Sequence, residues 1–206
     1  MALFDVLKYD ADSNEEIVWK FPGEELRLGA QLIVSQSQDA IFLKGGEVCD
    51  LFGPGTHTLA SGNLPILSKL INLPFGGDSP FAAEVWYVNR VAKRDMKWGT
   101  SSPIPLMDPI YKYPISVRAF GQWGFRVGDS LLFLNQLVGT LKYSSSDQVE
   151  DYFRGEIVQK LSNAISNFFV NDNTSIFQAN ARLNELSEFI KNSIGDEFQK
   201  FGIEII

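Results

Sequence analysis

The sequence predicts an α+β fold in which an antiparallel, β-rich N-terminal half is covered by amphipathic C-terminal helices. Two observations support this class. Before residue 129, β-prone runs are separated by glycine and proline turns, and from residue 129 onward apolar residues recur every three or four positions. We therefore expect one domain over residues 1–206, with a β-rich half at 1–128 and a helical half at 129–206 that ends in a strand.

Tight turns organise the first part of the chain. Gly45-Gly46 is expected to close a hairpin, because glycine readily adopts the positive φ that a two-residue loop requires. Gly53-Pro54-Gly55 is expected to turn the chain again, and the proline-punctuated residues 63–80 are expected to form a connector. The strands expected between these turns are 16–21, 32–35, 40–44, 47–52 and 84–91.

The clearest alternation lies later in the β-rich half. Four prolines restrict residues 98–114 to sheet edges or loops. Beyond them, a long half-buried strand is expected over residues 117–127, with the polar positions Arg118, Gln122 and Arg126 on one face. The residues expected on the opposite, buried face are Val117, Ala119, Gly121, Trp123, Phe125 and Val127.

The helical half has three expected helices and a final strand. A short apolar helix is expected over 131–141, a long one from Val149 to Phe168, and another from Ile176 to Phe198. Ser145 and Gln148 resemble a capping box at the start of the long helix. Gly202 suits a helix C-cap, and residues 203–206 are β-like.

Composition limits the possible chemistry. The chain has 18 basic and 25 acidic residues, a net charge of −7, which disfavours nucleic-acid binding. Cys49 is the one cysteine, so no intrachain disulfide can form; this fits a reducing compartment, and we expect Cys49 to be buried. With His57 as the one histidine, neither a zinc site nor a histidine-based triad can be assembled, and no cofactor is expected. No apolar run approaches the ~20 residues of a spanning helix.

Two alternatives come from other functional classes. Gly128-Asp129-Ser130-Leu131 matches the short motif of one esterase family, which would make the chain a serine hydrolase using Ser130. That family has its histidine downstream of the serine, however, whereas His57 lies upstream. A ligand-binding module with an aromatic pocket between helices and sheet is the other alternative. A cavity lined by Phe153, Trp123 or their neighbours would favour it.

The charges are unevenly distributed along the chain. Residues 84–126 contain seven basic and three acidic residues, whereas residues 1–50 contain four basic and ten acidic residues. This asymmetry could guide head-to-tail assembly or contact with anionic lipid head groups. The local basic cluster is the candidate partner-binding surface, and it consists of Arg90, Lys93, Arg94 and Lys97.

Several motifs, in this order, resemble those of the SPFH family, also called band 7, which includes stomatin, prohibitin and flotillin. They are DAIFLKGGEVCDLFGPGTHTL with its Leu-Pro connector, IYKYPISVRAFGQWGFRVGD, and the C-terminal KFGIEII. The segments LINLPFGGDSPF, KWGTSSPIPLMDPIY and VRAFGQWGFRV look like those of a soluble, YdjI-like bacterial branch often labelled "virion core protein". The resemblance covers nearly the whole chain.

This resemblance implies an α+β SPFH domain that acts as a non-catalytic, oligomerising scaffold at membranes. Most family members carry an N-terminal hydrophobic hairpin or an acylation site, and neither is recognisable here. We therefore expect a cytoplasmic protein that self-associates and is recruited by a membrane-protein partner to the inner face of the bacterial membrane. Because family members usually continue into a coiled coil, we also expect the chain to be a truncation of a longer protein.

Overall fold

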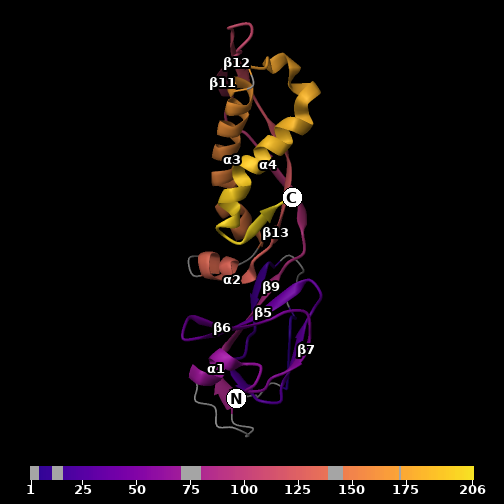
Figure 1. Cartoon of the computed structure of the whole chain (residues 1–206), viewed down its shortest axis with the longest axis vertical. Coiled ribbons are helices and arrows are strands. Elements are labelled where there is room, and N and C mark those ends of the chain that lie inside the picture. The colour runs from indigo at the N-terminus through magenta and orange to yellow at the C-terminus, as the bar shows by residue number, and fades with distance from the viewer. Residues whose placement is uncertain (1–4, 11–15, 71–79, 139–145, 172) are drawn as a thin grey trace. The chain divides into compact units, whose positions relative to one another are not determined.

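The fold consists of two compact units, each containing both strands and helices. The computed structural model describes residues 5–10, 16–70, 80–138, 146–171 and 173–206. Unit 1 combines Met1–Val91 with Asp129–Ser146, and unit 2 combines Ala92–Gly128 with Asp147–Ile206. The α+β class is confirmed, with mostly antiparallel strands in the N-terminal half and helices toward the C-terminus (Figure 1).

Unit 1 is built around a four-stranded antiparallel sheet with the order β2-β9-β5-β6. A second sheet has the order β1-β4-β7, in which β1 runs parallel to β4, and β3 pairs with β8. The strands are β1 (Val6–Lys8), β2 (Val18–Lys20), β3 (Glu25–Arg27), β4 (Gln31–Val34), β5 (Gln38–Lys44), β6 (Glu47–Phe52), β7 (Gly55–Thr58), β8 (Pro80–Ala82) and β9 (Glu84–Asn89).

The expected hairpin between β5 and β6 is confirmed. Gly45 and Gly46 have φ values of 61° and 83°, a conformation that side chains rarely adopt. Phe42 and Tyr87 are fully buried in the core of this unit, and Phe42 meets Phe52 edge-to-face at 5.4 Å between ring centroids. Aromatic and aliphatic side chains of the strands therefore pack together in one core.

The connector between β7 and β8 contains a short helix, α1 (Pro65–Leu70), that the proline pattern did not predict. Buried Asp50 on β6 holds its first turn: its Oδ2 accepts a hydrogen bond from the Leu67 amide at 2.9 Å, and its Oδ1 accepts one from the Ile66 amide at 3.3 Å. The free amides of a helix N-terminus require such acceptors. A carboxylate from a distant strand thus stabilises the helix.

The expected apolar helix after residue 129 begins as α2 (Ser130–Phe133) and continues as a π-helical turn over Leu134–Val138. Asp129 caps it by accepting a 2.9 Å hydrogen bond from the Leu132 amide. The remainder of the expected helix, together with Ser145 of the expected capping box, lies outside the described residues.

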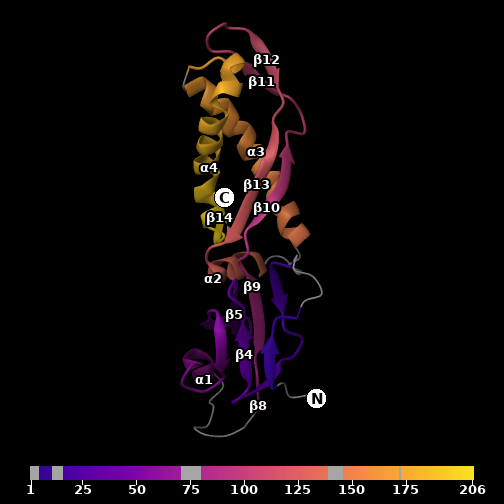
Figure 2. The same cartoon turned by 90° about the vertical axis from the view of Figure 1, so that its right-hand side faces the viewer.

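Unit 2 is a three-stranded antiparallel sheet, with the order β10-β13-β14, and two long helices (Figure 2). A two-stranded ribbon, β11-β12, is also part of this unit. Its elements are β10 (Lys93–Gly99), β11 (Ile104–Met107), β12 (Pro114–Val117), β13 (Phe120–Val127), α3 (Ser146–Asn171, whose first residue belongs to unit 1), the 3-10 helix η2 (Ile176–Arg182), α4 (Leu183–Gln199) and β14 (Ile203–Ile205).

The prediction of one long strand over residues 117–127 is wrong, because the chain divides this stretch between two strands, β12 and β13. The break falls at Arg118 and Ala119, where pairing changes from β11-β12 to β10-β13. Within β13 the expected alternation holds, with Phe125 and Val127 buried and Arg126 exposed. The partner with which a strand pairs depends on segments far away in the sequence, so the alternation of apolar and polar residues along the strand does not predict it.

The C-terminal elements follow the expected pattern with two corrections. The α3 residues at three- and four-residue spacing are buried, namely Phe153, Ile157, Leu161, Ile165 and Phe168. The helix expected from Ile176 to Phe198 starts as the 3-10 helix η2 before it becomes α4. The expected C-cap at Gly202 is wrong, because α4 ends at Gln199 with Lys200 as its C-cap. Gly202, with φ of 71°, lies in the turn before β14, and β14 forms as predicted.

Candidate functional site

The four residues of the expected basic cluster do not belong to one unit. Arg90 lies in unit 1, where its guanidinium contacts buried Asp39 at 3.4 Å. Lys93, Arg94 and Lys97 lie on β10, an edge strand of the unit 2 sheet, and the side chains of Arg94 and Lys97 are exposed. Arg94 and Lys97 are therefore the two cluster members that combine exposure with an edge strand.

Ser130 has the environment of an anchoring residue. Its hydroxyl is buried at the start of α2 and donates a 2.5 Å hydrogen bond to Oδ2 of Asp39, the same carboxylate that Arg90 contacts. The Nε2 atom of His57 instead lies 2.9 Å from the carbonyl oxygen of Gly53. The hydroxyl thus joins α2 to β5, and it is not paired with the imidazole that a serine–histidine mechanism uses as base.

Cys49 is buried on β6, as predicted. Burial raises the pKa of its thiol, and the neighbouring Asp50 carboxylate raises it further. A raised pKa keeps the sulfur in its unreactive thiol form at neutral pH. Among the described residues, no three His, Cys, Asp or Glu side chains gather in a way that could hold a metal ion.

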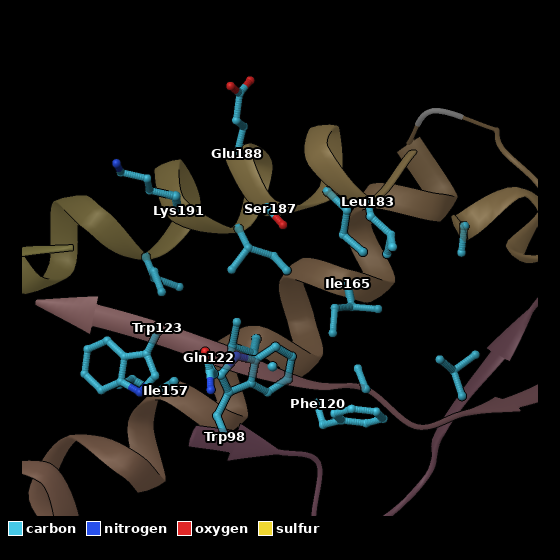
Figure 3. A pocket seen from close by; sticks show the side chains of 18 of the residues that line it. Trp98, Phe120, Gln122, Trp123, Ile157, Ile165, Leu183, Ser187, Glu188 and Lys191 are labelled. Carbon is cyan, nitrogen blue, oxygen red and sulfur yellow. The ribbon is translucent and has the colours of Figure 1, made fainter. Parts of the chain in front are cut away.

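A cavity of about 690 Å³ lies within unit 2 between the sheet and its helices (Figure 3). We call it the unit 2 groove. Strand residues form one wall, α3 forms a second, and η2 with α4 forms a third. The apolar residues that line it are Trp98, Val117, Ala119, Phe120, Trp123, Ile157, Leu161, Ile165, Phe169, Ile176, Ala179, Leu183, Leu186, Ile190, Ile194, Ile205 and Ile206.

The sequence identified part of this lining. Trp123 lines the groove, as the pocket alternative required, but Phe153 packs elsewhere, with its ring centroid 4.9 Å from that of Phe198. Sequence reasoning missed Trp98, which lies in the proline-rich stretch, and Phe120, which is 87% exposed. Phe120 alternates in step with the polar residues Arg118, Gln122 and Arg126. An aromatic residue on this polar face of the strand was the sign in the sequence that could have pointed to the groove.

The polar residues at the rim of the groove lie on two of its walls. Arg118 precedes β13, and Glu188 and Lys191 are exposed residues of α4. In Figure 3 the side chains of Glu188 and Lys191 point away from the strands, whereas Trp98 and Trp123 lie on the strand side of the groove. The groove is therefore mostly apolar, with the uncharged polar residues Gln122, Asn180 and Ser187 also in its lining.

Asp108 is a fully buried carboxylate that joins two segments of unit 2. Its Oδ1 accepts hydrogen bonds from the amides of Ile110 and Tyr111, and its Oδ2 accepts them from the Ser175 hydroxyl at 2.7 Å and the Ile176 amide at 2.9 Å. Burial by itself would raise the pKa of Asp108, but these hydrogen bonds together outweigh burial and lower the pKa. The loop between β11 and β12 is thereby attached to the start of η2.

An exposed apolar cluster surrounds this attachment. It consists of Ile110, Tyr111, Tyr113 and Phe177, and we call it the aromatic tip. Phe177 is 71% exposed and Tyr111 67% exposed, and their rings meet edge-to-face at 5.8 Å between centroids. Contiguous exposed apolar side chains are typical of interaction surfaces. The aromatic tip is therefore a candidate for contact with another macromolecule.

None of the described helices is both long enough and apolar enough to cross a membrane.

The comparisons with known proteins agree with the expected family. The model of the SPFH domain-Band 7 family matches residues 18–206. A curated protein of Bacillus subtilis (strain 168), named Uncharacterized protein YdjI, is 25% identical over 206 residues, which cover 98% of this chain and 62% of YdjI. The chain thus spans less than two thirds of that relative, and the similarity is consistent with a YdjI-like branch. Because the family model covers most of its residues, this chain belongs to the SPFH domain-Band 7 family.

Proposed function

We propose that this chain is a non-catalytic scaffold module that assembles with copies of itself and is recruited to the bacterial cytoplasmic membrane by a protein partner. Its membership in the SPFH domain-Band 7 family carries the proposal, because this membership suggests a membrane-associated scaffold-type module. The anchoring environment of Ser130 and the protonated thiol of Cys49 support a role without catalysis.

Self-association is proposed to use the aromatic tip. Tyrosine and phenylalanine supply a large contact area with few rotatable bonds, and such residues often dominate the binding energy of interfaces. Asp108 holds the tip loop on η2 through four hydrogen bonds, so the loop is preorganised for contact. A rigid, exposed aromatic surface has the features that assembly of identical subunits requires.

The double substitution Tyr111→Ser with Phe177→Ser should weaken self-association by at least about tenfold, because it removes two aromatic anchors from the interface. Sedimentation equilibrium of the purified chain measures the effect. Ile66→Ser is the matched control, because Ile66 is also an exposed apolar residue but lies in unit 1, away from the tip. A wild-type chain that stays monomeric up to its solubility limit would contradict the self-association proposal.

Recruitment is proposed to depend on Arg94 and Lys97. Reversing both charges, by Arg94→Glu with Lys97→Glu, should reduce binding to membranes from the native cell at least about fivefold, because like charges at an interface repel. Cosedimentation with those membranes measures the effect. Lys69→Glu with Lys200→Glu serves as a charge-matched control, since it changes net charge equally at positions outside the unit 2 groove.

A second arm of the same experiment separates a protein partner from direct lipid contact. Membranes treated with protease should lose the ability to bind the chain, and liposomes of the extracted lipids should not bind it. Equal binding to liposomes and native membranes would replace the protein partner by direct lipid contact. Binding to neither would overturn the recruitment proposal.

A further inference from the structure

The unit 2 groove has the size and composition of a ligand site. Its volume of about 690 Å³ lies within the range of roughly 300–1,000 Å³ that small-molecule sites have. Its floor and its margin differ in exposure. Ile157 and Ile165 on α3 are covered by their neighbours, at 1% and 2% exposed, whereas Phe120 and Leu183 leave apolar surface open, at 87% and 53% exposed.

The groove is elongated. Leu183 and Ile194, which lie eleven residues apart on α4, both line it, and at ~1.5 Å per helical residue they are roughly 17 Å apart. On the strand wall, Arg118 and Trp123 are five residues apart, which in an extended chain is again roughly 17 Å. The two walls therefore run side by side over a similar length, and a long, narrow apolar ligand matches this shape.

Two cations lie at the rim of the groove, Arg118 before β13 and Lys191 on α4, and Lys191 points away from the strands. Figure 3 shows Phe120 and Leu183 toward one end, and Trp123 and Lys191 toward the other. Along the chain Arg118 comes before Phe120 and Trp123 after it, so Arg118 precedes the Phe120 end of the strand wall. Arg118 is exposed and forms no ion pair with the described residues. A guanidinium at one end of an apolar groove is complementary to a carboxylate at the end of an apolar chain.

We propose that the unit 2 groove binds a long-chain fatty acid, with its carboxylate at Arg118 and its alkyl chain along the apolar walls toward Trp123. Each methylene buried between the strand and helix walls favours binding. The charge-assisted hydrogen bond to Arg118 orients the chain, because Lys191, the other cation of the rim, points away from the strand wall. This is a binding activity distinct from the scaffold role, and it does not require self-association or recruitment.

Quenching of tryptophan fluorescence tests the proposal on the intact chain. Palmitate brominated near its terminal methyl group should quench saturably below its critical micelle concentration. Unmodified palmitate should reverse this quenching by competition. The Trp123→Phe variant should lose a large part of the quenching, because Trp123 lies at the end assigned to the methyl group. Trp19 and Trp86 belong to unit 1 and supply the unquenched background.

Substitutions at the two parts of the site give separate readouts. Arg118→Gln should weaken palmitate binding about tenfold, whereas Arg118→Lys should stay within about threefold, because it retains the charge. Lys97→Gln removes an exposed cation from the same sheet without touching the groove and should leave binding unchanged. Ala179→Phe should abolish binding by filling the groove from η2. If Ala179→Phe does not fold, the palmitate affinities of Arg118→Gln and Arg118→Lys test the proposal in its place.

Several results would overturn the proposal. The first is a wild-type chain whose tryptophan fluorescence brominated palmitate does not quench saturably. The second is an equal affinity of Arg118→Gln and wild type for palmitate. The third is a chain that binds phosphatidylglycerol vesicles but not free palmitate. A fourth is dissociation of oligomers by Ala179→Phe in a chain that palmitate does not bind, which would identify a second copy as the occupant. Failure of self-association at the aromatic tip would leave the fatty-acid site intact, so the two proposals fail separately.

Discussion

Replacing Gly124 by alanine is expected to destabilise unit 2 by about 2 kcal/mol, an overpacking penalty out of proportion to one methyl group. A Cβ at Gly124 would lie 2.5 Å from the carbonyl oxygen of Lys93 and 3.0 Å from the Cα of Arg94. Both are backbone atoms of β10, so a side-chain rotation cannot relieve the clash. The register irregularity between Lys93 and Met96 lies at this place, and β10 would have to move away from β13.

Denaturant unfolding, monitored by the fluorescence of Trp98 and Trp123, measures the loss. Gly195→Ala is the matched control, because a Cβ there meets nothing within 4 Å and the residue lies inside α4. That variant should be more stable by roughly 0.5–1 kcal/mol, since alanine has the higher helix propensity. Equal effects of the two substitutions would show that the contact between Gly124 and β10 does not limit stability.

The Asp108→Ala substitution is expected to lower the midpoint of thermal unfolding of unit 2 by about 5–10 °C. It removes a fully buried carboxylate that accepts four hydrogen bonds, and it leaves the Ser175 hydroxyl and three backbone amides without their acceptor. Asp108→Asn should lose less, because its carbonyl oxygen can still accept at one of the two positions. Calorimetry of the three chains measures the order.

The contribution of Asp108 should also depend on pH. Its folded-state pKa is lower than its ordinary value, so the folded state binds the proton less readily than the unfolded chain. The stability it contributes is therefore fully present above the ordinary aspartate pKa and is lost as the pH falls through the lowered, folded-state pKa. The stability difference between wild type and Asp108→Asn should shrink over that acidic interval. A difference that stays constant down to the most acidic pH at which the chain folds would contradict this assignment.

Local chemistry allowed several elements to be predicted. The hairpin at Gly45-Gly46, the alternation of β13 and the turn at Gly202 are each determined by residues within a few positions of one another. The buried face of α3 likewise follows from spacing along one helix. The family motifs were also readable, because they combine such local signals in a fixed order, and the family model confirms them.

The candidate sites were harder to predict because they combine distant segments. Asp108 binds Ser175, 67 residues later in the chain, and no periodic pattern connects two such positions. The Asp108-Pro109 dipeptide was a local sign of a turn, but it could not reveal the partner. Trp98 became part of the groove only because β10 pairs with β13, which places it opposite Gly121.

The sequence by itself determined the α+β class, the family, the main turns and the apolar faces of the long helices. Only the tertiary structure decided that residues 92–128 join the C-terminal helices in unit 2, that one alternating stretch forms two strands, and that a groove is left between α4 and the sheet. The physical reason is the range of the interactions. Turn conformation and amphipathic periodicity depend on neighbouring residues, whereas strand partners and packing volume depend on side chains that meet only after the chain has folded.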